Sequence, residues 1–150
     1  MANSIQYAKI VSVPSEKVDT NELAGRVRVA FAEYEATTEQ STITMFTIPN
    51  GARLLSAAIS HDQLAGSTTT LSVGNAAYTD ADGTAVALDV DAYKAAASSA
   101  SATSSDALVT MALGKNAVVD ANEDGLPVTV TLAGANGTGT IQLQMFYVLD

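Results

Sequence analysis

The stretch PVTVTLAGANGTGTIQLQMFYVL, residues 127–149, decides the fold class of this chain. In its first part, Val128, Val130 and Leu132 alternate with threonines. In its second part, polar residues alternate with a longer apolar row, which consists of Ile141, Leu143, Met145, Tyr147 and Leu149. Alternation with a period of two is typical of a strand with one buried face. Glycines and Asn136 separate the two runs, so we predict one long β-hairpin.

The same pattern recurs upstream. Val27, Val29 and Phe31 alternate within residues 26–35, which predicts a half-buried strand. Tyr34 continues that strand only after a bulge that shifts its face. Further strands are predicted from β-branched and apolar composition, at residues 42–48, 53–60, 68–73, 106–113 and, more briefly, 117–119. Because Pro49-Asn50-Gly51 favours a tight turn, we expect residues 42–60 to form a second hairpin.

One helix is predicted, over residues 91–97, because the run Tyr-Lys-Ala-Ala-Ala has good helix propensity. The Ser/Ala/Thr run at 98–105 is read as a surface loop. Seven or eight short strands with at most one short helix predict the all-β class, with an antiparallel β-sandwich or a barrel as the architecture.

Residues 1–25 show no sustained period, and we expect an N-terminal arm in front of one β-sandwich domain over 26–150. The arm is predicted to be extended, with at most a short strand at 7–13. Terminal segments of this kind are ordered when something ties them down, and in an assembly that is often a neighbouring subunit. Ile10, Val11 and Val13 are therefore predicted interface residues.

Two further predicted interface residues are Phe146 and Val148, which fall on the otherwise polar side of the last strand. Apolar residues on both faces of a strand indicate burial on both sides. Either another part of the fold or another subunit is expected to cover them.

Composition excludes several classes of function. The net charge of −9 argues against nucleic acid and anionic membranes as partners, since both select basic surfaces. The sequence shows neither a signal peptide nor the ~18 consecutive apolar residues of a membrane span. The absence of cysteine excludes disulfides and thiolate sites, and it fits assembly in a reducing cytoplasm.

The run Ser60-His61-Asp62 contains the single histidine and invites comparison with a catalytic triad. Triad members meet through the fold, whereas neighbours on a strand point to opposite faces. With one histidine, no cysteine and no paired carboxylates on a rigid element, we predict no enzyme and no cofactor.

Asp120, Asn122 and Asp124 match the first half of the calcium-loop pattern, followed by Gly125. The twelfth position of that pattern requires a bidentate Glu, and Thr131 stands there instead. Asp, Asn and Gly also favour any exposed turn, so the expected metal content is none.

The run ITMFTIPNGARLLSAAISHDQL at 43–64, with TTLSVG at 69–74 and the closing strand at 141–149, resembles a pattern of small virion proteins of tailed bacteriophages. The resemblance implies a single jelly roll. It also implies a head decoration (cement) protein, a homotrimer on the capsid exterior of the virion that binds the major capsid protein.

The alternative is a head-fibre, tail or adhesion module that binds host-surface glycans. A glycan site needs exposed aromatic residues near one group of loops. Tyr78 and Tyr93 are the loop candidates, in a chain that has no tryptophan.

Overall fold

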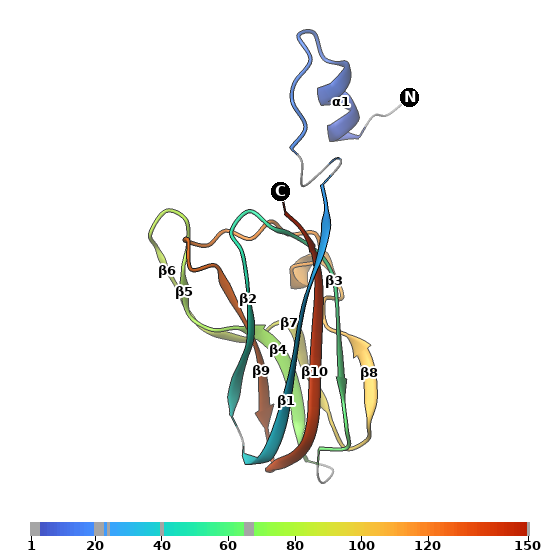
Figure 1. Ribbon diagram of the computed structural model, residues 1–150, viewed down its shortest axis with the longest axis vertical. Coiled ribbons are helices and arrows are strands. Elements are labelled where there is room, and N and C mark those ends of the chain that lie inside the picture. Colours follow the sequence, from blue (N-terminus) through green and yellow to red (C-terminus); the bar gives the residue numbers. More distant parts are fainter. Residues whose placement is uncertain (1–3, 20–22, 24, 40, 65–67, 150) are drawn as a thin grey trace.

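The computed structural model describes every residue except 1–3, 20–22, 24, 40, 65–67 and 150. Two four-stranded antiparallel sheets pack face to face (Figure 1). Sheet A has the order β1 (Val27–Glu39), β10 (Gly137–Val148), β3 (Arg53–His61) and β8 (Thr103–Asp106). Sheet B has the order β2 (Thr42–Ile48), β9 (Leu126–Ala133), β4 (Thr70–Asn75) and β7 (Asp89–Ser98). A small hairpin of β5 (Tyr78–Thr79) and β6 (Ala85–Val86) extends from one end.

The strand pairing is nested. β1 pairs with β10, β2 with β9, β3 with β8 and β4 with β7, all antiparallel. This order arises when one long hairpin is folded over itself, and it defines a jelly roll. The predicted fold class, an all-β antiparallel sandwich of the jelly-roll type, is therefore confirmed.

Both predicted hairpins are wrong in their pairing, although the strands exist. β2 lies in sheet B and β3 in sheet A, so the turn at Pro49-Asn50-Gly51 crosses between the sheets. The turn between β9 and β10 also leads from sheet B to sheet A. Turn residues show that a chain reverses direction, but the identity of the next partner depends on long-range pairing.

The predicted helix at 91–97 is also wrong, because these residues lie in strand β7. Their pairing with β4 joins Leu71 to Ala97 and Val73 to Lys94, and this long-range contact overrides local helix propensity. Tyr93 is 7% exposed and packs in the core.

The strand predicted at 106–113 is wrong, because the observed strand, β8, ends at Asp106. β8 occupies residues that were read as a loop, and 111–113 form the short 3-10 helix η1 (Met111–Leu113). At 117–119, Val118 makes an isolated bridge to Arg53. Exposed serines and threonines on an edge strand have the composition of a loop, which explains the error.

The N-terminal segment contains a helix, α1 (Ile5–Val11), instead of an extended chain or a strand at 7–13. Ser4 caps it, since the Ser4 side chain accepts a hydrogen bond from the Tyr7 backbone N–H at 3.2 Å. In Figure 1 this segment extends beyond the end of the sandwich from which β1 starts. None of its seven residues is buried.

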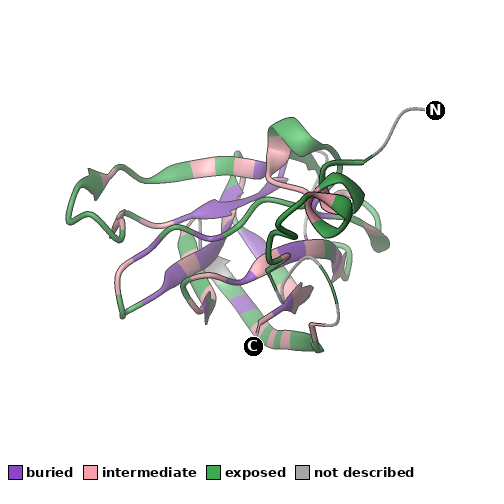
Figure 2. Cartoon of the chain, turned by 90° about the horizontal axis from the view of Figure 1, so that it is seen from above, coloured by how far each residue is buried: buried purple, intermediate pink, exposed green. Residues whose placement is uncertain are grey.

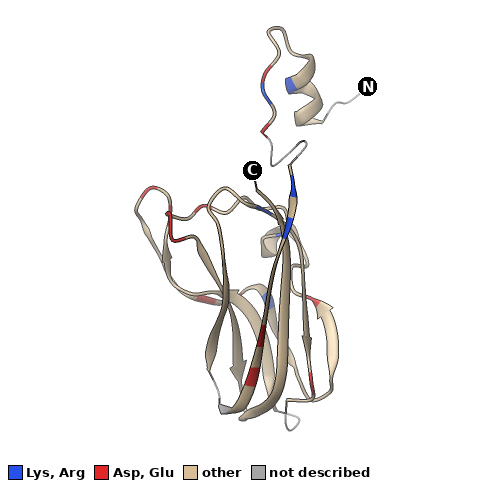
Figure 3. Ribbon diagram, in the orientation of Figure 1, with Lys and Arg blue, Asp and Glu red and all other residues tan. Residues whose placement is uncertain are grey.

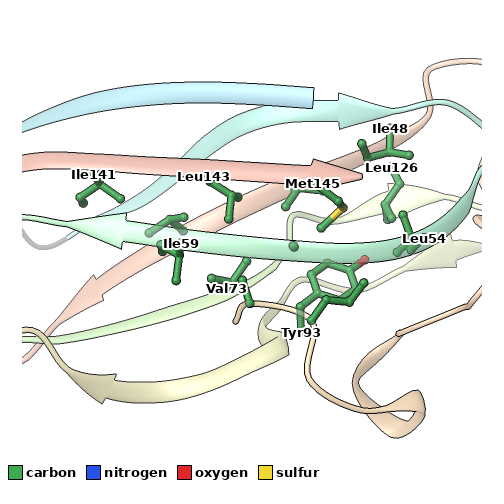
Figure 4. Packing of buried hydrophobic residues seen from close by; sticks show 14 of the residues in the cluster. Ile48, Leu54, Ile59, Val73, Tyr93, Leu126, Ile141, Leu143 and Met145 are labelled. Carbon is green, nitrogen blue, oxygen red and sulfur yellow. The ribbon is translucent and has the colours of Figure 1, made fainter. Parts of the chain in front are cut away.

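The core lies between the two sheets (Figures 2 and 4). The buried row of β10 supplies Ile141, Leu143 and Met145, each 0% exposed. Across the sandwich they meet the inner residues of sheet B, which include Val73, Val128 and Val130. Within the described part of the chain, no helix combines the length and the apolar character needed to cross a bilayer.

The last residues of β10 keep their alternation. The register with β3 shifts between Phe146 and Tyr147, opposite an extra residue in β3, whereas the register with β1 continues unbroken to Val148. Tyr147 packs against the core with partial burial, as the inward row predicts. Val148 pairs with Val27 and is 7% exposed, and Phe146 is half-buried.

Candidate assembly surface

The outer face of sheet A carries an exposed apolar row. Val29 lies opposite Phe146 and Phe31 opposite Gln144, so these side chains share the outer face. The intervening residues, Ala30 and Ala32, lie opposite Met145 and Leu143 of the core. We call the outer residues Val27, Val29, Phe31 and Phe146 the β1–β10 stripe.

In the β1–β10 stripe, the side chains of Val27, Val29 and Phe31 are 62%, 55% and 59% exposed. A contiguous apolar surface on a protein is commonly an interaction site. β1 is also the edge strand of sheet A, and sheet edges are usually protected by charge, by shortness or by a covering partner. The stripe therefore has the properties of a surface that another molecule covers.

The other half of the same face is polar. The Gln142 side-chain amide donates a hydrogen bond to Glu33 Oε2 at 2.7 Å. The Thr140 hydroxyl donates to Glu35 Oε2 at 2.8 Å. The outer face of sheet A is thus divided along the strands into an apolar half and an acidic half.

The N-terminal arm presents a second set of exposed apolar side chains. Ile10 and Val11 are each 48% exposed and Val13 is 98% exposed. The arm folds back after α1, because the Ser12 hydroxyl donates to the Lys9 carbonyl at 2.8 Å and accepts from the Glu16 N–H at 3.1 Å.

The structure thus distributes the five predicted interface residues over different environments. Ile10, Val11 and Val13 are exposed on the arm. Phe146 is half-buried in the stripe, and Val148 is covered by the chain's own fold.

Most of the acidic residues belong to the sandwich (Figure 3). The arm, residues 1–25, holds two basic and three acidic residues, so its net charge is −1. Residues 26–150 hold five basic and thirteen acidic residues, so their net charge is −8. Both parts of the chain are therefore acidic.

The candidate calcium residues lie in a pair of acidic loops beside the β5–β6 hairpin. The Asp120 carboxylate accepts a hydrogen bond from the Ala81 N–H at 3.2 Å. The Asn122 amide donates to Asp124 Oδ2 at 3.0 Å. These contacts are those of ordinary polar turns. Among the described residues, no group of three or more His, Cys, Asp or Glu side chains is arranged to hold a metal.

A hollow of about 380 Å³ lies next to these loops and is lined partly by Tyr78, Asn122 and Pro127. Partial burial raises the pKa of Tyr78, with smaller contributions from the nearby Asp120 and Asp80 carboxylates. Tyr93 was the other aromatic candidate for glycan stacking. Its burial in the core removes it from any such surface.

The Ser60-His61-Asp62 run does not form a triad. The Ser60 hydroxyl donates to the Ser104 hydroxyl at 2.9 Å, and His61 Nδ1 lies 2.7 Å from the Asp62 backbone carbonyl. Asp62 Oδ2 accepts from the Thr140 N–H at 3.1 Å. The three side chains thus face different partners along the rim of a polar hollow of about 500 Å³.

The stripe on β1 was missed although its alternation was recognised. Val27, Val29 and Phe31 were read as the buried side of the strand, but they face outward. The inner row runs through Ala30, Ala32 and Tyr34 to the buried Ala36 without the bulge expected at Tyr34. β1 thus carries apolar residues on both sides, and only the inner row is buried by the described part of the chain.

Comparison with known proteins shows similarity of fold. No protein-family model and no curated protein sequence matches the chain. A chain of the Ralstonia phage GP4 capsid is similar, with a TM-score of 0.62 and 22% identity over 84% of this chain and 86% of that one. A chain of the cyanophage Pam1 capsid asymmetric unit has a TM-score of 0.56 and 22% identity, with the same coverage. A chain of the Helicobacter pylori bacteriophage KHP30 capsid gives 0.45 and 20% identity, over 82% and 87%. The jelly roll of this protein is thus a fold found in chains of bacteriophage capsids.

Proposed function

We propose that this protein is a structural component of a bacteriophage virion and, more specifically, a decoration or cement subunit on the outside of the head. The observation that carries the proposal is the shared fold with phage capsid chains, which spans more than four fifths of both partners. The exposed apolar stripe and the exposed arm supply surfaces for assembly. The partners in this proposal are the major capsid protein and further copies of the chain, as a homotrimer assembled in the host cytoplasm.

The physical role of a cement subunit is to add contact area across boundaries between capsid proteins. Packed DNA would push such a shell outward, and a cement subunit would bridge these boundaries. Each Å² of apolar surface removed from water contributes about 25 cal/mol before the costs of ordering are subtracted. A trimer that binds with three arms gains further through effective concentration, since the second and third contacts form within one particle.

The test uses heads of the encoding phage that lack this chain. Purified full-length protein should co-sediment with these heads and raise the temperature at which they release DNA. Protein that lacks residues 1–25 should keep the far-ultraviolet spectrum of the β-domain but bind the heads more weakly. Equal binding by the truncated protein would contradict the role of the arm, and no binding by either form would contradict the cement function.

A glycan-binding fibre or adhesion module is the second candidate. Its support is limited to the hollow beside Tyr78, because Tyr93 lies in the core. A glycan array with the purified protein separates the two candidates: a specific saccharide signal that is lost in Tyr78→Ala would favour the adhesion module.

A further inference from the structure

The chain contains two Asn-Gly pairs, and both lie where the chain crosses between the two sheets. Asn50-Gly51 follows β2, and Asn136-Gly137 connects β9 to β10. In such a pair the glycine nitrogen can attack the side-chain amide of the asparagine, because the glycine has no Cβ that hinders the approach. Every other asparagine of the chain precedes a residue with a Cβ, so these two pairs are the ones to compare.

The structure holds both reacting groups of the Asn50-Gly51 pair in hydrogen bonds. The Oδ1 atom of Asn50 accepts a hydrogen bond from the Ala121 N–H at 3.3 Å. The Gly51 N–H donates to the Val119 carbonyl at 2.9 Å. The reaction requires the amide side chain to turn toward the glycine nitrogen and that nitrogen to lose its proton. Both hydrogen bonds must therefore break before Asn50 can react.

The Asn136-Gly137 pair is held less firmly. The Asn136 side chain is exposed and makes no hydrogen bond with the described residues. Gly137 is the first residue of β10, and the register with β1 shifts between Thr37 and Glu39, the residue that pairs with Gly137. A bulge disrupts the hydrogen-bond ladder locally, and the ends of strands open more readily than their centres. The fold therefore restrains this pair much less than it restrains Asn50-Gly51.

We propose that Asn136 is a site of spontaneous deamidation in the folded protein, whereas Asn50 is protected. The Gly137 nitrogen loses its proton to water and attacks Cγ of Asn136. The new N–Cγ bond closes a five-membered succinimide, and the side-chain amide takes up a proton and leaves as ammonia. Water then opens the ring at one of its two carbonyls. The product is either aspartate or isoaspartate, in which the backbone runs through Cγ, and water is the only co-reactant.

The reaction changes the end of the sandwich that lies opposite the arm (Figure 1). Either product adds one negative charge to a chain of net charge −9. Isoaspartate also lengthens the backbone by one atom before Gly137, where an added Cβ would lie only 2.9 Å from the Leu64 carbonyl oxygen. Because the backbone is confined there, we expect isoaspartate to displace the first residues of β10. The proposal concerns the purified chain and does not depend on a role in the virion.

The test follows both asparagines in one sample. Purified full-length protein is incubated at mildly alkaline pH and physiological temperature, and portions are digested at intervals. Mass spectrometry of the peptides detects the replacement of an NH2 group by an OH group at each position. We expect Asn136 to be converted at least about tenfold faster than Asn50, because two hydrogen bonds must break at Asn50. Equal rates, or a faster reaction at Asn50, would overturn the proposal.

The same chain in concentrated urea is the control for the local sequence. Without the fold, the two Asn-Gly pairs should react at similar rates, so a difference seen only in the folded protein is due to the structure. If Asn136 stays intact in the folded protein for a time that converts most of it in urea, the turn is closed to the reaction and the proposal is wrong.

Two variants give a second readout on the intact protein. In Asn136→Gln and Asn50→Gln, attack on the longer side chain would have to close a larger ring, which forms more slowly. On ion exchange, the chain with its natural sequence should accumulate a more acidic species with time, and so should Asn50→Gln, but Asn136→Gln should not. A methyltransferase specific for isoaspartate should label the same two aged proteins. An acidic species that forms equally fast in Asn136→Gln would contradict the assignment to Asn136.

Discussion

Strands β10 and β1 lie side by side in sheet A and both alternate with a period of two, yet they direct their larger apolar residues to opposite sides. β10 directs Ile141, Leu143 and Met145 into the core, where each is fully buried. β1 directs Val29 and Phe31 outward and leaves Ala30 and Ala32 on the inner side. Periodicity thus identifies a strand, whereas the side that faces the core depends on what packs against each side.

The position of each strand in the sheet explains the difference. β10 is central, with β1 and β3 on its two sides, so its inner row must fill the middle of the sandwich. β1 is at the edge of the sheet, and its side chains Val29 and Phe31 are exposed on the outer face. Substitutions on the two strands should therefore act on different properties.

The largest effect is expected in the buried row. Leu143→Ala removes a fully buried side chain from the centre of the core. The free energy of unfolding should fall by about 2–5 kcal/mol, from lost burial plus the cavity that remains. Urea denaturation followed by circular dichroism measures this change. A loss below about 1 kcal/mol would show that the core is less tightly packed than described.

The second prediction concerns close contact between β4 and β7 in sheet B. Gly74 of β4 lies directly against the start of β7, the next strand of sheet B: an added Cβ would clash with the Asp89 carbonyl oxygen and would lie 2.6 Å from the Val90 carbonyl carbon. Gly74→Ala should therefore cost about 1–3 kcal/mol of unfolding free energy, because backbone atoms must move. An unchanged midpoint of urea denaturation would mean that the backbone of β7 does not lie this close to Gly74.

The third prediction concerns alkaline pH. Burial, and to a lesser degree the nearby Tyr78 and Asp89, raises the pKa of Tyr93 well above its usual value near 10. Below pH 10 both folded and unfolded chains hold the proton, and above it the unfolded chain releases the proton first. The free energy of unfolding should therefore decrease by about 1 kcal/mol between pH 10 and 11 on account of this group. Tyr93→Phe should remove that part of the decrease, and identical slopes in the two proteins would contradict it.

The smallest effect on folding is expected on the stripe. Phe31→Ser changes an outward side chain that is 59% exposed, so the unfolding free energy of the monomer should change by less than about 0.5 kcal/mol. The measurement is made at a concentration where the protein is monomeric. A loss of several kcal/mol would place Phe31 in the core and remove the contrast between β1 and β10.

Much of the fold could be predicted from sequence. Alternation located β1, β9 and β10 within a few residues, since burial on one face leaves a local pattern, and apolar and β-branched composition located β2, β3 and β4. The pairing of β9 with β2 and β4, instead of with β10, has no local signature. β7 was missed because Ala95 and its neighbours favour a helix in isolation. The apolar residues of the arm are visible in the sequence. The outward direction of Val27, Val29 and Phe31 becomes clear only from the pairing of β1 with β10 at the edge of sheet A.

The central claim, that the protein decorates the outside of a phage head, is tested most directly by electron cryomicroscopy of heads of the encoding phage made with and without this chain. The account predicts difference density for a jelly roll on the outer surface, at boundaries between capsid proteins, with an arm that reaches a neighbouring copy. Heads that show no such outer density, or density confined to the tail, would contradict it.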